Sequence, residues 1–257
     1  MPHKPFNMLD ILNKILNKFQ LELIKTNKIN ELPIDFDPLH KNIWRQAQNH
    51  TMTSPERIFS LIESVKHVVN NQIEGAFVEC GVWKGGSMMA AIETLKHQNV
   101  FNRELYLYDT FEGMSEPTEN DIDHAQQSAA EQLAQRNKNE SDVVWAYSPL
   151  EAVQKSVLST GYPSDLIHFI KGKVEETIPN TLPDKIAILR LDTDWYESTK
   201  HELAHLFPLL THGGILIIDD YGHWAGAKKA VDEYFLNLNE KYFMHRIDNT
   251  GRLIIKK

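Results

Sequence analysis

The chain has 257 residues, of which 42% are hydrophobic, so it is long enough for one α/β domain with a buried core and an extra segment. Its formal net charge of −8 argues against a nucleic-acid partner, because nucleic-acid-binding domains normally carry a basic surface. Its single cysteine, Cys80, excludes an internal disulfide and fits a small buried side chain in a reducing compartment.

The first fifty residues predict a helical extension followed by a linker. Residues 1–30 repeat apolar side chains at helical spacing, namely Leu9, Leu12, Leu16, Phe19 and Leu23. The polar face lacks the basic bias of a membrane-surface helix, so we expect this helix to cover the active site or to contact a partner subunit in a homo-oligomer. Residues 31–50 contain Pro33 and Pro38 and look like a linker. The sequence shows no run long enough to span a membrane and no signal-peptide pattern, so we expect a cytoplasmic protein without membrane insertion.

Residues 51–80 predict a helix and then the first strand of a sheet. Thr53 or Ser54 fits the N-cap of the helix, and Pro55 fits its first turn. After Gly75, residues 76–80 form the short apolar run that is typical of a buried strand.

A glycine-bearing turn over residues 81–87 follows this strand and leads into a helix. Glycines allow the backbone to approach a ligand, and a helix N-terminus offers free N–H groups. Tight strand-to-helix turns also need glycine for steric reasons alone. The spacing is not the dinucleotide pattern G-x-G-x-x-G, so the turn by itself leaves a ligand role and a structural role equally open.

The next predicted strand, residues 104–108, ends on Asp109. A carboxylate at this place can accept both hydroxyl protons of a ribose, so the turn and Asp109 together favour an adenosyl ligand. Residues 113–135 form a polar loop that passes into a weak helix. This loop is either a mobile flap over the site or a solvated surface loop.

Two later strands are predicted to end in acid pairs. One apolar run precedes Asp192 and Asp194, and another precedes Asp219 and Asp220, with a helix between them that is expected to end at residues 212–214. Since the carboxyl ends of parallel strands lie at one edge of a sheet, Asp192, Asp219 and Asp220 should converge there. Bound Mg²⁺, Mn²⁺ or Ca²⁺ would relieve their repulsion, whereas solvated turn residues are the alternative explanation.

The chain ends in a predicted antiparallel hairpin, formed by residues 242–247 and 253–256 around a turn at residues 248–251. A parallel sheet that finishes in this way is typical of the seven-stranded class I methyltransferase sheet and not of nicotinamide-binding Rossmann sheets. We therefore expect an α/β fold of this Rossmann-like class, with seven strands, a terminal antiparallel hairpin and helices on both faces.

Five motifs in one order resemble those of a known family. They are MTSPER at 52–57, FVECGVWKGGS at 77–87, DTFEGM at 109–114, LDTDWYEST at 191–199 and IDDYG at 218–222. Over residues 50–256 the sequence resembles the macrocin O-methyltransferase family, which consists of sugar O-methyltransferases that use S-adenosylmethionine and Mg²⁺ and includes mycinamicin and novobiocin tailoring enzymes. We expect the methyltransferase domain at 51–257 and the extension at 1–50.

The resemblance implies S-adenosyl-L-methionine and Mg²⁺ or Mn²⁺ as cofactors. Around the methionine end of the cofactor it places Glu79, Gly81, Gly85, Gly86 and Ser87. It places Asp109 on the ribose, and Gly172 and Lys173 beside the adenine. The other cofactor-binding positions that it implies are Thr53, Val82, Trp83, Thr110 and Phe111. The implied metal ligands are Asp192, Asp219 and Asp220.

The expected reaction moves a methyl group to a sugar hydroxyl of a glycosylated small molecule or a saccharide. A metal lowers the pKa of a coordinated hydroxyl and positions it, and Asp192 is the expected catalytic residue, as a metal ligand and as a possible proton acceptor. His124 or His223 is the alternative acceptor of the proton. Two other functions stay open: a nicotinamide-dependent sugar oxidoreductase and a non-catalytic adenosyl-binding subunit.

Overall fold

The computed structural model describes residues 32–139 and 141–257, and the chain forms two compact units, Met1–Phe36 and Asp37–Lys257. The helix predicted over residues 1–30 lies outside the described residues. Within the first unit, residues 33–36 form a turn in which the Phe36 N–H donates to the Pro33 carbonyl at 3.1 Å. The predicted sheet and site belong to the second unit.

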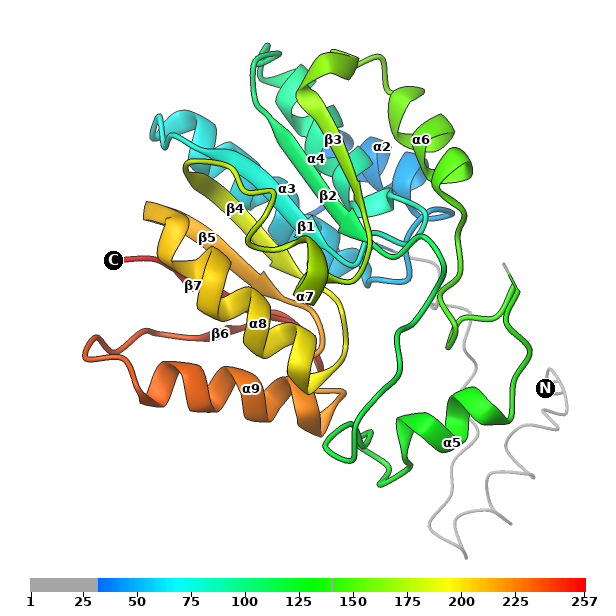
Figure 1. The fold of residues 1–257 in the computed structure, drawn as a ribbon. Coiled ribbons are helices and arrows are strands. Elements are labelled where there is room, and N and C mark those ends of the chain that lie inside the picture. Colours follow the sequence, from blue (N-terminus) through cyan, green and yellow to red (C-terminus); the bar gives the residue numbers. More distant parts are fainter. Residues whose placement is uncertain (1–31, 140) are drawn as a thin grey trace, which may run out of the picture. The chain divides into compact units, whose positions relative to one another are not determined.

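The second unit is built on a seven-stranded sheet with the order β3-β2-β1-β4-β5-β7-β6 (Figure 1). The strands are β1 (Ala76–Cys80), β2 (Leu105–Asp109), β3 (Ile167–Lys171), β4 (Ile186–Leu191), β5 (Leu210–Ile218), β6 (His245–Arg246) and β7 (Arg252–Ile255). The strands from β1 to β5 pair in parallel, whereas β7 is antiparallel to both β5 and β6. This order confirms the predicted class I methyltransferase fold with its terminal hairpin.

Helices cover both faces of the sheet, with α2, α3 and α4 on one face and α8 and α9 on the other (Figure 1). The helices are α2 (Pro38–Ala47), α3 (Pro55–Asn70), α4 (Gly86–His97), α5 (Ala129–Ala134), α6 (Leu150–Leu158), α7 (Val174–Thr177), α8 (Tyr196–Leu206) and α9 (Ala225–Leu236), with 3₁₀ turns η2 (Ser164–Leu166) and η3 (Phe207–Leu209). No helix in the described part of the chain combines the length and the apolar character needed to cross a membrane.

The alternation of strand side chains builds a separate core on each face. In β1, Phe77 belongs to the core beneath α3 and α4, whereas its neighbour Val78 belongs to the core beneath α8 and α9. Every residue of β1 and β4 is buried, which explains why both strands are mostly apolar, with Glu79 and Arg190 as their one charged residue each. Strands buried on both faces hold the loops at their carboxyl ends in fixed positions.

The expectation of a linker over residues 31–50 was wrong for residues 38–47, which form α2. The Asp37 side chain caps this helix by accepting from the His40 N–H at 2.9 Å, and Pro38 occupies its first turn. Ile43 and Ala47 are buried in the core beside α4. The Asp-Pro pair is therefore a helix start.

The helix α8 ends earlier than predicted. The expected end at residues 212–214 was wrong, because η3 follows α8 and β5 already begins at Leu210. The pairing of β4 with β5 shifts register between Ile186 and Ile188, and Gly213 adopts a left-handed φ of 78°. Gly213 and Gly214 therefore lie at an irregularity inside a strand. Glycine is common both at such irregularities and at helix ends, so its presence alone does not distinguish the two.

Candidate active site

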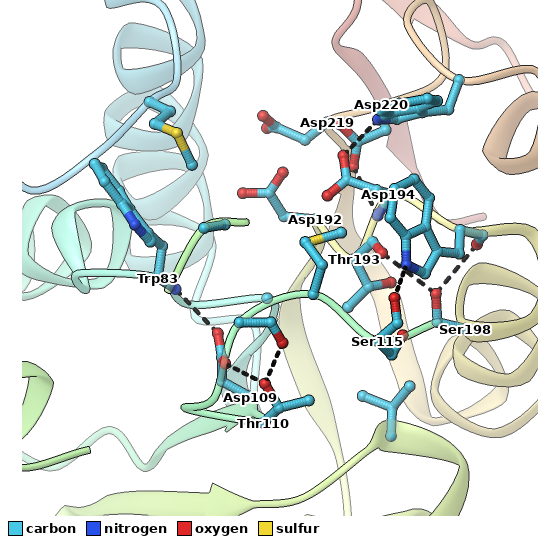
Figure 2. A pocket seen from close by; sticks show the side chains of 18 of the residues that line it. Trp83, Asp109, Thr110, Ser115, Asp192, Thr193, Asp194, Ser198, Asp219 and Asp220 are labelled. Carbon is cyan, nitrogen blue, oxygen red and sulfur yellow. Dashed lines mark hydrogen bonds between the residues drawn. The ribbon is translucent and has the colours of Figure 1, made fainter. Parts of the chain in front are cut away.

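A cavity of about 700 Å³ lies at the carboxyl ends of the strands. This volume is within the range of small-molecule sites, and the position is the one at which parallel α/β sheets bind ligands. The lining residues that the sequence predicted as site residues are Thr53, Gly81, Trp83, Asp109, Thr110, Gly172, Lys173, Asp192, Asp219 and Asp220. Figure 2 shows two groups in this cavity, Trp83 with Asp109 and Thr110 in one, and the aspartates that follow β4 and β5 in the other.

Six of the predicted cofactor residues are not part of this lining, namely Glu79, Val82, Gly85, Gly86, Ser87 and Phe111. The Gly86 N–H at the start of α4 donates to the His50 carbonyl at 2.8 Å, so this N–H already has a partner within the chain. A Cβ on Gly86 would lie 2.5 Å from the same carbonyl, and one on Gly85 would lie 2.6 Å from Val157. Packing within the chain alone therefore requires glycine at these two positions. Their contact with a cofactor stays a prediction.

Asp109 anchors the glycine-bearing turn. Its Oδ2 accepts from the Val82 N–H at 2.7 Å and from the Trp83 N–H at 3.0 Å, and its Oδ1 accepts from the Phe111 N–H at 2.7 Å. Trp83 and Phe111 both have a left-handed φ, of 48° and 52°. Burial raises the pKa of Asp109, although the three backbone N–H groups oppose this shift. The carboxylate therefore fixes the shape of the turn as well as facing the cavity.

The loops after β4 and β5 bring four aspartates together, Asp192, Asp194, Asp219 and Asp220 (Figure 2). The Asp194 N–H donates to Asp220 Oδ2 at 3.2 Å, which joins the two loops directly. The Asp194 carboxylate accepts from the Trp224 indole N–H at 2.7 Å. Asp194 and Trp224 are site residues that the sequence did not reveal as such.

Two arginines neutralise part of this acidic group. Arg190 is buried and lies 2.7 Å from Glu79, 2.8 Å from Asp192 and 2.8 Å from Asp219. Arg57 of α3 pairs with Asp219 and, through Nε, with Asp248 at 3.0 Å. Both arginines were missed from the sequence, although a charged residue inside the apolar run of β4 is itself a sign of a buried ion pair.

Glu79 and the four aspartates outnumber the two arginines that pair with them, and the pKa values of several of these carboxyl groups are raised. Burial raises the pKa of Glu79 to about 7 against the opposing effect of Arg190, and burial together with Asp192 raises that of Asp194 to about 7. Burial also raises the pKa values of Asp192 and Asp220, and neighbouring aspartates add to the effect. A group of this kind favours a bound cation.

The donor chemistry of Asp192, Asp219 and Asp220 fits a divalent metal. All are hard carboxylate oxygens, which suit Mg²⁺ or Mn²⁺, and all three residues line the cavity. Among residues 32–139 and 141–257, no three acidic, histidine or cysteine side chains are grouped closely enough to hold an ion as they stand. Asp219 is paired with both arginines, so a cation at this residue would have to share or displace one of these partners.

The segment of residues 113–135 packs against the site and forms one boundary of the cavity. Buried Asp121 accepts from the Tyr196 N–H at 2.8 Å, and the Ala225 N–H donates to the Ile122 carbonyl at 2.8 Å. Ala129 and Leu133 of α5 belong to one apolar cluster with Trp195, Trp224 and Ala227. The expected flap or solvated loop is therefore in large part a packed boundary of the cavity.

Of the two histidines considered as proton acceptors, only His223 lines the cavity. Burial lowers its pKa, and the exposed His124 beside it adds to this effect, with ring centroids 5.0 Å apart. Trp195 also lines the cavity, is buried, and donates its indole N–H to the Ser115 carbonyl at 3.1 Å.

Comparison with known proteins finds one matching family. The model of the family macrocin-O-methyltransferase (TylF) matches residues 8–256. The chain is 32% identical over 246 residues to 8-demethyl-8-(2,3-dimethoxy-alpha-L-rhamnosyl)-tetracenomycin-C 4′-O-methyltransferase of Streptomyces olivaceus, covering 95% of this chain and 90% of that protein. It is 34% identical over 185 residues to mycinamicin III 3″-O-methyltransferase of Micromonospora griseorubida, covering 72% and 70%. The solved structure of the O-methyltransferase NovP superposes with a TM-score of 0.70 at 29% identity, covering 80% of this chain and 82% of that chain.

Proposed function

Because the chain belongs to the macrocin-O-methyltransferase family, we propose that it transfers a methyl group from S-adenosylmethionine to a sugar hydroxyl of a glycosylated small molecule or saccharide, with a divalent metal at the acceptor. The tetracenomycin relative has a rhamnosyl group in the name of its substrate, and the mycinamicin relative is likewise a natural-product O-methyltransferase. The family match does not favour the nicotinamide-dependent alternative.

The observation that carries this proposal is the single cavity that joins Asp109 to the aspartates after β4 and β5. Residues suited to an adenosyl ligand and residues suited to a chelated diol thus face the same space. Methyl transfer needs this arrangement, because the acceptor oxygen must lie in line with the methyl carbon and the sulfur. A non-catalytic binding subunit has no need of it.

In the proposed mechanism, Asp192, Asp219 and Asp220 would hold a divalent metal, which when bound would act as a Lewis acid toward the acceptor hydroxyl, and S-adenosylmethionine would supply the electrophilic methyl group. The acceptor oxygen forms the new C–O bond, the C–S bond breaks with its electron pair on sulfur, and the hydroxyl proton leaves. Asp192, with Oδ2 held by Arg190 at 2.8 Å, offers its other oxygen to the metal or the proton. Trp195 and Trp224 are buried side chains that line the cavity, and their apolar rings limit the access of water to the acceptor.

The acceptor proton has a second possible destination in His223. Metal-bound carboxylates are weak bases, and His223 lines the same cavity on the β5 side.

An assembly into homo-oligomers and a cytoplasmic location also remain parts of the proposal. Sedimentation of the full chain tests the first, because a monomer at working concentration would contradict it.

The experiment that tests the function is a methyl-transfer assay with S-adenosylmethionine, Mg²⁺ and a panel of neutral glycosides that carry vicinal hydroxyls. We expect mass spectrometry to detect S-adenosylhomocysteine and a product heavier by one methylene. Asp192→Asn should lower kcat about a thousandfold, on the scale of a lost transition-state contact. Asp232→Asn, on the exposed side of α9, is the control. Full turnover by Asp192→Asn would contradict the role of Asp192.

A further inference from the structure

Asp219 is held on both of its oxygens by positive charge. Its Oδ1 lies 2.8 Å from Arg190 Nη2, and its Oδ2 pairs with Arg57 Nη1 and accepts from the Thr53 hydroxyl at 3.3 Å. The residue is only 3% exposed, so these pairs are poorly screened by solvent. An additional cation on Asp219 must therefore share an oxygen with a guanidinium or take its place.

The two arginines differ in how readily they can leave Asp219. Arg190 is buried in the sheet and also binds Glu79 and Asp192, so it has no free direction in which to move. Arg57 lies at the cavity wall, and its side chain is 15% exposed. Of the two, Arg57 is the one that can give up its oxygen.

Arg57 also has a second carboxylate within reach. Its Nε lies 3.0 Å from Asp248 Oδ2 in the hairpin turn between β6 and β7. Asp248 is fixed in turn by the Ser54 hydroxyl at 2.6 Å and by the N–H groups of Thr250 and Gly251 at 2.9 and 2.7 Å. A guanidinium that leaves Asp219 thus keeps an ion pair, which lowers the cost of its departure.

We propose that Arg57 is an internal counter-cation of the metal site, which neutralises Asp219 in the metal-free protein and competes with the divalent cation for Asp219 Oδ2. Asp248 sets the balance of this competition, since it holds the guanidinium after displacement. Arg57 is thereby a positioning residue that keeps the metal weakly bound and exchangeable. This inference rests on the metal site of the proposed function.

The test is a titration of the full chain with Mn²⁺ alone, in which the electron paramagnetic resonance signal of free Mn²⁺ reports binding without any turnover. We expect Arg57→Met to bind Mn²⁺ about tenfold more tightly than the wild type, on the scale of one charge-assisted hydrogen bond. Asp248→Asn should bind Mn²⁺ more weakly than the wild type, because Arg57 then has only Asp219 as an anionic partner. Arg57→Lys, which keeps the charge, should stay near the wild-type affinity.

Arg45→Gln, on the exposed surface of α2, removes the same charge outside the cavity lining and controls for a general electrostatic effect. Mn²⁺ binding by Arg57→Met that equals or falls below the wild-type binding would overturn the role of Arg57 and leave the metal site intact. If the Arg57→Met protein fails to fold, an Asp248→Asn affinity equal to or above that of the wild type overturns it in the same way. Absence of Mn²⁺ binding by the wild type would contradict the metal part of the proposed function itself.

Discussion

The indole nitrogen of Trp224 donates a hydrogen bond of 2.7 Å to the carboxylate of Asp194. Asp194 adopts a φ of 68°, a left-handed conformation that is uncommon for residues other than glycine. Its N–H is held at the same time by Asp220 Oδ2 at 3.2 Å. The loop after β4 is thus kept in a strained conformation by two residues from the loop after β5.

Trp224→Phe keeps the ring in the apolar cluster but removes this hydrogen bond. We expect kcat to fall about tenfold, the equivalent of one net hydrogen bond, because the aspartates of the two loops lose their mutual alignment. The affinity for S-adenosylhomocysteine should stay unchanged. Steady-state methyl-transfer kinetics measure the effect, and Trp145→Phe, which removes only an indole bond of 3.4 Å to the Arg136 carbonyl, is the matched control. Equal losses in both variants would argue against the specific role of Trp224.

Gly226→Ala should disturb the segment of residues 113–135, which forms a boundary of the cavity beside the proposed acceptor site. A Cβ at this position would lie 2.1 Å from Asp121 Oδ1, the atom that accepts from the Tyr196 N–H. The segment around Asp121 must then move, and we expect the KM for the acceptor to rise about tenfold, which matches the usual cost of overpacking. Calorimetry with S-adenosylhomocysteine should give an unchanged Kd. A variant whose acceptor KM equals that of wild type would show that this segment does not shape the acceptor site.

Asp109→Asn should weaken cofactor binding through the shape of the glycine-bearing turn. An amide has one acceptor oxygen, whereas Asp109 uses both oxygens to hold three backbone N–H groups. We expect the Kd for S-adenosylhomocysteine to rise at least about tenfold and the free energy of unfolding to fall by about 2 kcal/mol. Calorimetry and thermal unfolding measure the two effects. Asp165→Asn, on an exposed turn, is the control, and a wild-type Kd in Asp109→Asn would exclude the proposed role.

Glu202→Gln should change the pH dependence of stability. Glu202 is fully buried on α8, where it accepts from the Thr193 hydroxyl at 2.9 Å, and burial raises its pKa well above the ordinary value. Between the unfolded and the folded pKa, the unfolded chain has already lost the proton that the folded protein keeps, so rising pH destabilises the fold.

Glutamine cannot ionise, so the variant should gain a few degrees in Tm over the wild type at pH 8 and little at pH 4. Thermal unfolding at both pH values measures this difference. Glu197→Gln, exposed on the same helix, should track the wild type at each pH. A Tm gain that is as large at pH 4 as at pH 8 would assign the effect to packing and not to the proton.

The central strands β1 and β4 were predictable because they are buried on both faces, and such burial leaves a mostly apolar run in the sequence. The boundaries of β1 matched the prediction, and the acids after β4 and β5 met at one cavity as expected. The glycines at residues 213 and 214 misled the prediction, since glycine marks a helix end and a strand irregularity equally well.

The partners of the predicted acids could not be read from the sequence. Arg57 meets Asp219 across 162 positions of the chain, and Trp224 meets Asp194 across 30. Such contacts depend on how loops from different strands are placed, which no local periodicity records. The packing of residues 113–135 was hidden for the same reason, because the polar composition of this segment resembles that of a solvated loop although Asp121 is completely buried.

Calorimetric titration of the full chain with S-adenosylhomocysteine, with and without Mg²⁺, shows whether the cavity binds the adenosyl cofactor. NAD serves as the control ligand in the same buffer. We expect saturable binding of S-adenosylhomocysteine and no heat of binding from NAD. Binding of NAD, or no binding of either ligand, would contradict this expectation and leave the glycine-bearing turn and Asp109 with a structural role alone.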